Sequence, residues 1–347
     1  MAIVVPVAVG LGFLIWWRGP DWSLVGDAFQ AVRWEWVALA IALNLVSVLV
    51  RSIAWKTIID QAMPKPHPPF RLVFSAFSVG LFANAVLPGR VGELARVAVL
   101  TRKLPGRAGA WAALIGTVFA HRVFDLIPSV LLIVYVVFTA KIPHWAITSL
   151  IVVVGIGFGL FAFALASARR HHRSVLDETG TIRRLVTMGR YGLGVLHAPV
   201  PAVIAAFFQC LGWLCQLLAV YTAMRAFNIH APLPAAALVL VLMNVATLFP
   251  LWPGNNIGLL QAAIALPLVS YGVAKADGIA FGFGLQFIEA SVGVGVGLLF
   301  LAREGLSFAM LRHMPEASQA EVPEGERAEE RRAAETDGAR ARARISG

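Results

Sequence analysis

Five stretches of this sequence are apolar for twenty residues or more, which is more apolar surface than one water-soluble core can bury. They span residues 35–59, 108–138, 144–167, 199–226 and 277–302. A helix of about 20 apolar residues crosses the roughly 30 Å hydrocarbon layer of a bilayer. Hydrophobic residues make up 59% of the 347 positions and charged residues 14%. The chain is therefore predicted to be an all-α polytopic membrane protein, with about six to eight spans.

Residues 2–17 are also apolar. Neither a basic leader nor a small-residue cleavage site accompanies them, so we predict a retained span rather than a signal peptide. Cys210 and Cys215 lie within one apolar stretch. Cysteines in such a place are usually small packing residues, and they predict neither a disulfide nor a metal site.

Positive charge is concentrated in the loops between the apolar stretches, which predicts the orientation of the chain. The net charge is +10, but its distribution is typical of cytoplasmic loops rather than of a nucleic-acid-binding face. The basic segments 56–71, 102–107 and 168–198 are predicted to face the cytoplasm, and 18–35 and 139–145 the outside. Both termini then lie in the cytoplasm, and we expect a bacterial inner-membrane protein that binds no nucleic acid.

The composition divides the chain into two parts. Residues 1–302 form the predicted membrane domain. Residues 303–347 are rich in alanine, glutamate and arginine, with no aromatic residue beyond Phe308. Such a composition cannot build a packed core, so this segment is predicted to be a disordered cytoplasmic tail.

Two shorter apolar pairs, each interrupted by a Pro-Gly, predict two hairpins that cross the membrane fully or re-enter on one side. The pairs are 70–87 with 91–104, and 232–250 with 257–272. Their central segments are similar in sequence, and the loop charges open the first to the cytoplasm and the second to the outside. Opposite orientation of similar units is the inverted repeat of alternating-access transporters. The predicted hinge residues are Pro88, Gly89, Gly92, Pro253, Gly254 and Gly258.

Arg122 and Asp125 lie near the middle of an apolar stretch, where a charge costs about 2.5–3.5 kcal/mol on insertion scales. Three residues apart on a helix, they can pair. A structural ion pair would explain their burial. We favour a functional interpretation, in which Arg122 meets an anionic group, because ionisable residues within the membrane commonly mark transport paths.

The first Pro-Gly is followed by Arg90, Glu93 and Arg96, around a helix predicted to begin near Val91. The free N–H groups of a helix start attract anions, and Arg90 would reinforce that attraction. A capped turn at the membrane surface is the alternative. Together with the buried Arg122, these residues favour a phosphate site.

In the second unit, Asn255, Asn256 and Gln261 replace these charges. Amides at a helix start either cap it or bind sugar hydroxyls and phosphate oxygens. Glu289 is a second deeply placed carboxylate, predicted either to pair with Arg96 or Arg122 or to exchange a proton.

Asn44 and Arg51 are weaker candidates. We expect Asn44 to link helices and Arg51 to extend toward the interface. The sequence contains no ATP-binding loop, no metal-ligand spacing and no Ser/His/Asp set, so we expect neither an enzyme nor a cofactor.

Three sets of residues resemble the flippase-like transmembrane family, which includes the membrane part of lysylphosphatidylglycerol synthase. They are the segment 84–96 with its Leu-Pro-Gly-Arg-x-Gly-Glu-x-x-Arg core, Arg122 with Asp125, and Pro253-Gly254 with Gly258. The similarity covers roughly residues 35–302. It departs from the family pattern at Gln261, where glutamate is more common. The resemblance implies movement of anionic lipids, such as aminoacylated phosphatidylglycerol or polyprenyl-phosphate glycolipids, between leaflets.

The predicted function is therefore translocation of an anionic phospholipid, glycolipid or polyprenyl-phosphate-linked lipid. Two alternatives stay open. One is a secondary carrier for a small soluble anion, and the other is a membrane scaffold that binds a cell-envelope enzyme.

Overall fold

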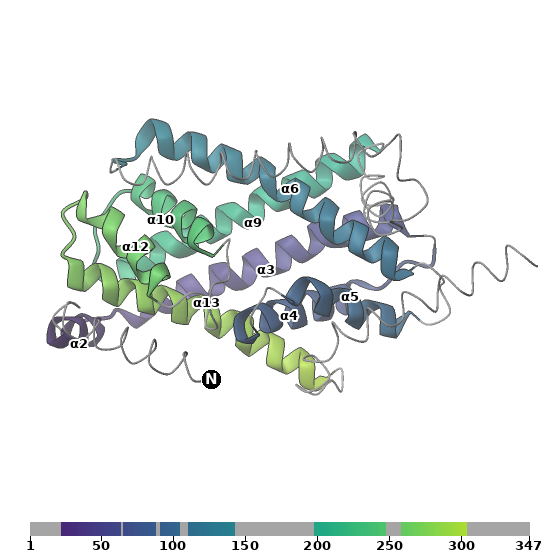
Figure 1. The fold of residues 1–347 in the computed structure, drawn as a ribbon, viewed down its shortest axis with the longest axis horizontal. Helices are drawn as coiled ribbons and strands as arrows, with labels where there is room; N and C mark the ends of the chain where they lie inside the picture. The colour runs from purple at the N-terminus through teal and green to yellow at the C-terminus, as the bar shows by residue number, and fades with distance from the viewer. Residues whose placement is uncertain are drawn as a thin grey trace, which may run out of the picture.

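A computed structural model describes residues 22–63, 65–87, 91–104, 110–142, 198–247 and 258–303. All regular structure in these ranges is helical, in agreement with the predicted all-α class (Figure 1). The helices are α2 (Trp22–Gln30), α3 (Trp34–Ala62), α4 (Phe70–Val86), α5 (Gly92–Lys103), α6 (Ala110–Thr139), α9 (Pro199–Ala226), α10 (Leu233–Ala246), α12 (Leu259–Val269) and α13 (Lys275–Arg303).

Within the described ranges, four helices are long and apolar enough to cross a bilayer, namely α3, α6, α9 and α13. They confirm four of the five long apolar stretches as helices. The fifth, 144–167, lies outside the described residues, as do residues 2–17 and all but the first residue of the tail. Large apolar side chains are exposed along α6, which suits lipid rather than water. Examples are Leu126, Val130, Leu131 and Phe138.

The segment 18–35 was expected to be a loop, but it contains α2. The reason is a small apolar face, in which Val25 is buried and the ring of Phe29 meets the ring of Phe227 edge-on at 5.5 Å. A backbone hydrogen bond from Arg33 N to Ala226 O, 2.9 Å long, holds the end of this segment against α9.

The two predicted hairpins are present as two pairs of short helices in contact, α4 with α5 and α10 with α12. The four helices have 17, 12, 14 and 11 residues. At 1.5 Å per residue they are roughly 16–26 Å long, less than the hydrocarbon layer. These lengths favour the re-entrant form. The Pro-Gly tips, with Pro88, Gly89, Pro253 and Gly254, lie outside the described residues.

The two pairs lie toward opposite ends of the long helices (Figure 1). One buried apolar cluster surrounds α10 and α12 and includes Met224, Leu240, Ile264 and Phe281. A second surrounds α4 and α5 and includes Trp55, Phe77, Leu100 and Leu114. The long helices therefore connect two separately packed ends, and Glu93 and Arg96 of the site described next belong to α5, within the second of them.

Glycine allows α4 and α5 to approach closely. Gly80 and Gly92 face each other, and a Cβ on Gly92 would overlap both the Gly80 carbonyl and the Asn84 side chain. The Asn84 carboxamide oxygen accepts a hydrogen bond from the backbone N–H of Gly92, 2.8 Å away, and so caps the start of α5. In the second pair, Gly258 precedes α12 with a φ of +93°, a conformation that favours glycine.

Gly92→Ala is expected to lower the free energy of unfolding by about 1–3 kcal/mol, because the added methyl group has no space between α4 and α5. Gly295→Ala on α13 is the matched control, since nothing lies within 4 Å of its added Cβ. Thermal unfolding in detergent compares the two variants. Equal stability would show that α4 and α5 are not packed as closely as described.

Candidate functional site

Asp125 on α6 is the centre of a buried polar network that joins three long helices. Its side chain accepts hydrogen bonds from Arg51 on α3 at 3.0 Å, from Arg122 at 3.2 Å and from the Trp213 indole at 2.9 Å. Gln209 also donates to it. The residue is only 7% exposed. Ion pairs and hydrogen bonds with these partners offset the free-energy cost of removing a carboxylate from water.

The predicted Arg122–Asp125 pair is thus present but is not self-contained, because Asp125 also pairs with Arg51. Arg51 was expected to extend toward the interface, and that expectation is wrong. Its side chain is 19% exposed, and its guanidinium lies 5.9 Å from the Trp213 ring centre. The inward path exists because Gly212 on α9 has no side chain. A Cβ there would overlap Arg51.

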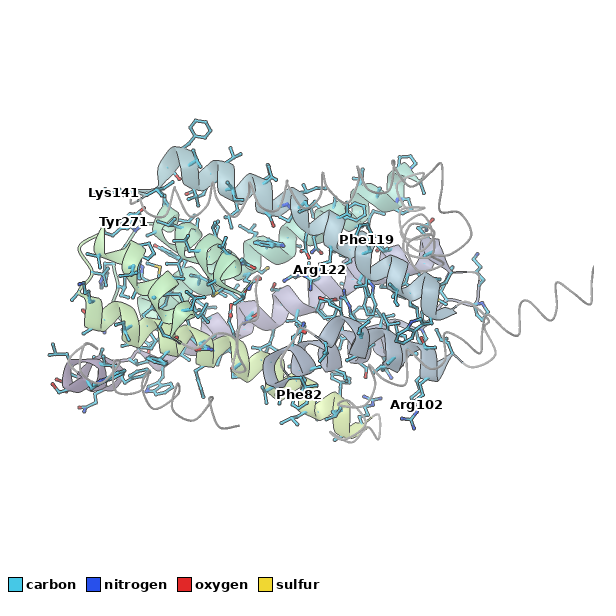
Figure 2. The ribbon with its side chains drawn as sticks, viewed as in Figure 1. Phe82, Arg102, Phe119, Arg122, Lys141 and Tyr271 are labelled. Carbon is cyan, nitrogen blue, oxygen red and sulfur yellow. The ribbon has the colours of Figure 1, made fainter. Side chains whose placement is uncertain are left out.

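Glu93 on α5 is the second carboxylate of the site. Its Oε2 lies 2.5 Å from Arg96 Nη2, and its Oε1 pairs with Arg122. Arg122 therefore contacts Glu93 on a short helix and Asp125 on a long one. Its side chain remains 48% exposed, and it lies midway along the bundle, whereas Arg102 and Lys141 lie at opposite ends (Figure 2).

Arg96 is almost completely buried, at 4% exposed. Its guanidinium stacks over Trp55 at 4.6 Å and over Phe77 at 5.6 Å, where cation–π attraction supports a desolvated positive charge. Among the described residues its Nε has no hydrogen-bond partner. A buried arginine with an unused donor is suited to receive an oxygen-rich anion.

The charged residues surround a cavity of about 190 Å³. Arg51, Glu93, Arg96, His121 and Arg122 all line it. His121 Nε2 lies 3.4 Å from the backbone oxygen of Arg51. Arg96 and Arg122, predicted from two separate motifs, thus face the same space.

A second cavity of about 510 Å³ adjoins the first. Its lining combines amide and charged groups with apolar side chains. Five residues line both cavities, so the two share a wall or are continuous. They are Arg51, Phe77, Leu81, Asn84 and Gln216.

Glu289 lines the larger cavity and does not pair directly with Arg96 or Arg122. Instead its Oε1 accepts a hydrogen bond from Gln216 Nε2 at 3.4 Å, and Gln216 Oε1 lies 3.5 Å from Arg51 Nη1. Gln216 thereby connects Glu289 to the Arg51–Asp125 pair. Asn44 lines the same cavity.

Gln261 has a structural position in the second unit. It accepts a hydrogen bond from the Gly258 N–H at 2.6 Å and donates one to Gln286 at 2.5 Å. It is buried and is not among the residues that line the two cavities. Arg90, Asn255 and Asn256 lie outside the described residues.

The residues that the sequence interpretation missed lie on one face of α9. Gln209, Gly212, Trp213 and Gln216 recur at helical spacing. A row of amides and a small residue in a membrane helix is itself a signal of a polar helix contact. Within the described ranges, no three His, Cys, Asp or Glu side chains are grouped to hold a metal ion.

Comparison with known proteins agrees with the motifs. The family model described as the lysylphosphatidylglycerol synthase TM region matches residues 3–297. The UPF0104 membrane protein PH1989 of Pyrococcus horikoshii is similar, at 28% identity over 157 residues. That match covers 45% of this chain and 44% of the relative, so it spans less than half of either protein. No solved structure matches this chain.

Proposed function

This chain belongs to the family of the lysylphosphatidylglycerol synthase transmembrane region, and we propose that it moves an anionic lipid between the two leaflets of a membrane. The proposed site is the smaller cavity, in which Arg96 and Arg122 bind the lipid phosphate. The proposed location is a bacterial cytoplasmic membrane, with both termini in the cytoplasm.

The convergence of Arg51, Arg96 and Arg122 around one cavity is the observation that supports this proposal. Three guanidinium groups pair directly with only two carboxylates, Glu93 and Asp125, because Glu289 is separated from the arginines by Gln216. Charge-assisted hydrogen bonds from arginine to phosphate are strong and often bidentate. A structural ion pair alone would need neither the third arginine nor the unused Nε of Arg96.

Arg122 also suggests how binding and movement are coupled. Glu93 pairs with both Arg96 and Arg122, so a phosphate would compete with this carboxylate. Displacing Glu93 would loosen the contact between α5 and α6. The location of the two short pairs at opposite ends (Figure 1) supports an inverted repeat, in which such a change opens one side while the other closes.

Reconstitution into liposomes tests the proposal directly. Acyl-labelled fluorescent phosphatidylglycerol should move between leaflets faster than in protein-free vesicles, while the zwitterionic phosphatidylcholine analogue should not. Dithionite quenching of the outer leaflet measures both. Uptake of inorganic phosphate without lipid movement would instead identify a carrier of soluble anions. Movement of neither would leave a scaffold role and overturn the proposal.

A further inference from the structure

The larger cavity has apolar lining that the phosphate site does not use. This lining comes mainly from α4 and α13, and includes Ala85, Phe287, Ala290 and Gly293. Its volume of about 510 Å³ lies within the usual range for a ligand site. A small phosphate bound by Arg96 and Arg122 would leave this space unfilled.

The cavity lies at the depth of the hydrocarbon layer. Its lining residues on α13 fall near the middle of that 29-residue helix. The residues from α3 are also near its midpoint. Phe287 lines the cavity and is 68% exposed, so the cavity reaches the outer, lipid-facing surface of the bundle beside this ring.

The two helices close the cavity further along. At Gly297, one turn beyond Gly293, a Cβ would overlap the Phe82 side chain and lie 2.9 Å from the Ser78 carbonyl oxygen. Phe82 lies where α4 meets α13 (Figure 2). At Gly293 the helices are further apart, since the nearest atoms to an added Cβ are 3.8 and 3.9 Å away. The space is therefore a groove with a closed end at Gly297 and an opening at Phe287.

We infer that this groove between α4 and α13 holds one hydrocarbon chain of the lipid whose phosphate occupies the smaller cavity. The inference rests on the proposed function. Five residues line both cavities, so one amphipathic molecule can fill both at once. A soluble anion has no part that fits the groove.

The groove is expected to contribute to selectivity among lipid chains rather than to the overall affinity for lipid. A chain that leaves the bilayer for the groove exchanges one apolar surrounding for another, so no hydrophobic gain accompanies the transfer. Van der Waals contact inside a groove that is closed at one end still depends on the length and shape of the chain. The groove is thus expected to discriminate among lipids with the same headgroup.

Gly293→Leu should block the groove, because its Cβ would already be in ordinary contact with Leu81 and Ala85 and the rest of the side chain would occupy the groove that Gly293 lines. Gly295→Leu is the matched control. It is the same change two residues along α13, on an exposed face with nothing within 4 Å. Ala290→Leu, also at the cavity, serves as a second blocking variant in case Gly293→Leu does not fold.

Each variant is reconstituted and assayed with long-chain and dihexanoyl phosphatidylglycerol analogues. Gly293→Leu and Ala290→Leu should slow long-chain movement about tenfold, the size expected for an overpacking cost near 1.4 kcal/mol. Movement of the dihexanoyl analogue should change less than about twofold. Gly295→Leu should resemble the unmodified protein with both lipids.

Long-chain movement at the unmodified rate in both blocking variants would overturn the groove assignment and leave lipid transport intact. Equal loss of both lipids would also overturn it, because the cavity would then not distinguish chains. If the unmodified protein moves neither analogue, the proposed function itself fails. The three results are separable within one set of vesicles.

Discussion

Asp125→Ala is expected to lower the free energy of unfolding by about 3–5 kcal/mol, the usual cost of removing one partner from a buried ion pair. The carboxylate accepts hydrogen bonds from four side chains on three helices. Its loss leaves Arg51 without its counter-ion and the buried Gln209 amide without its acceptor. Thermal unfolding in detergent measures the effect.

Asp60→Ala is the control for this prediction. Asp60 pairs with Lys56 at 2.5 Å near the end of α3, and its side chain is 28% exposed, against 10% for Asp125. Pairs of this kind contribute up to about 1 kcal/mol. If both substitutions cost the same stability, the Asp125 network does not hold the long helices together.

Arg122→Gln is expected to slow lipid movement roughly 10- to 100-fold, since a hydrogen bond to a charged group contributes about 1.5–3 kcal/mol. Folding should be nearly unaffected. Asp125 keeps Arg51, and Glu93 keeps Arg96, so neither carboxylate loses its last cation. The liposome assay and thermal unfolding are measured on the same preparation.

Two further substitutions sharpen the test of Arg122. Arg122→Lys keeps the positive charge but cannot donate two parallel hydrogen bonds as a guanidinium does, so its lipid movement should lie between those of Arg122→Gln and the unmodified protein. Arg102→Gln removes a positive charge from an exposed position at the end of α5, and should leave transport unchanged. Lipid movement by Arg122→Gln at the unmodified rate would remove Arg122 from the site.

Helix lengths and the first motif could be predicted from the sequence because both depend on neighbours along the chain. An apolar run defines α3, α9 or α13 without reference to its partners, and Glu93 with Arg96 is a pair within one helical turn. Arg51 could not be assigned in this way. Its partners Asp125 and Gln216 lie 74 and 165 residues away, and only the packing of α3 against α9 and α6 brings them together.

The same limitation applies to Glu289 and to α2. Glu289 was recognised as a deep carboxylate, but it is connected to the other charges through Gln216, which lies 73 residues away along the chain. The charges in 18–35 indicated a loop, yet burial of Val25 and contact between Phe29 and Phe227 stabilise a short helix there. Tertiary contact decided both cases.

The order of Asp125's partners along the chain has a consequence for biosynthesis. A ribosome completes α3 before α6, and α9 only afterwards. Asp125 can pair with Arg122 as soon as α6 is helical, and its second cation, Arg51, is already synthesised on α3; both pairs reduce the cost of placing a carboxylate in hydrocarbon. Gln209 and Trp213 arrive later and complete its hydrogen bonds. Both arginine partners of Asp125 are therefore synthesised before the neutral donors of α9.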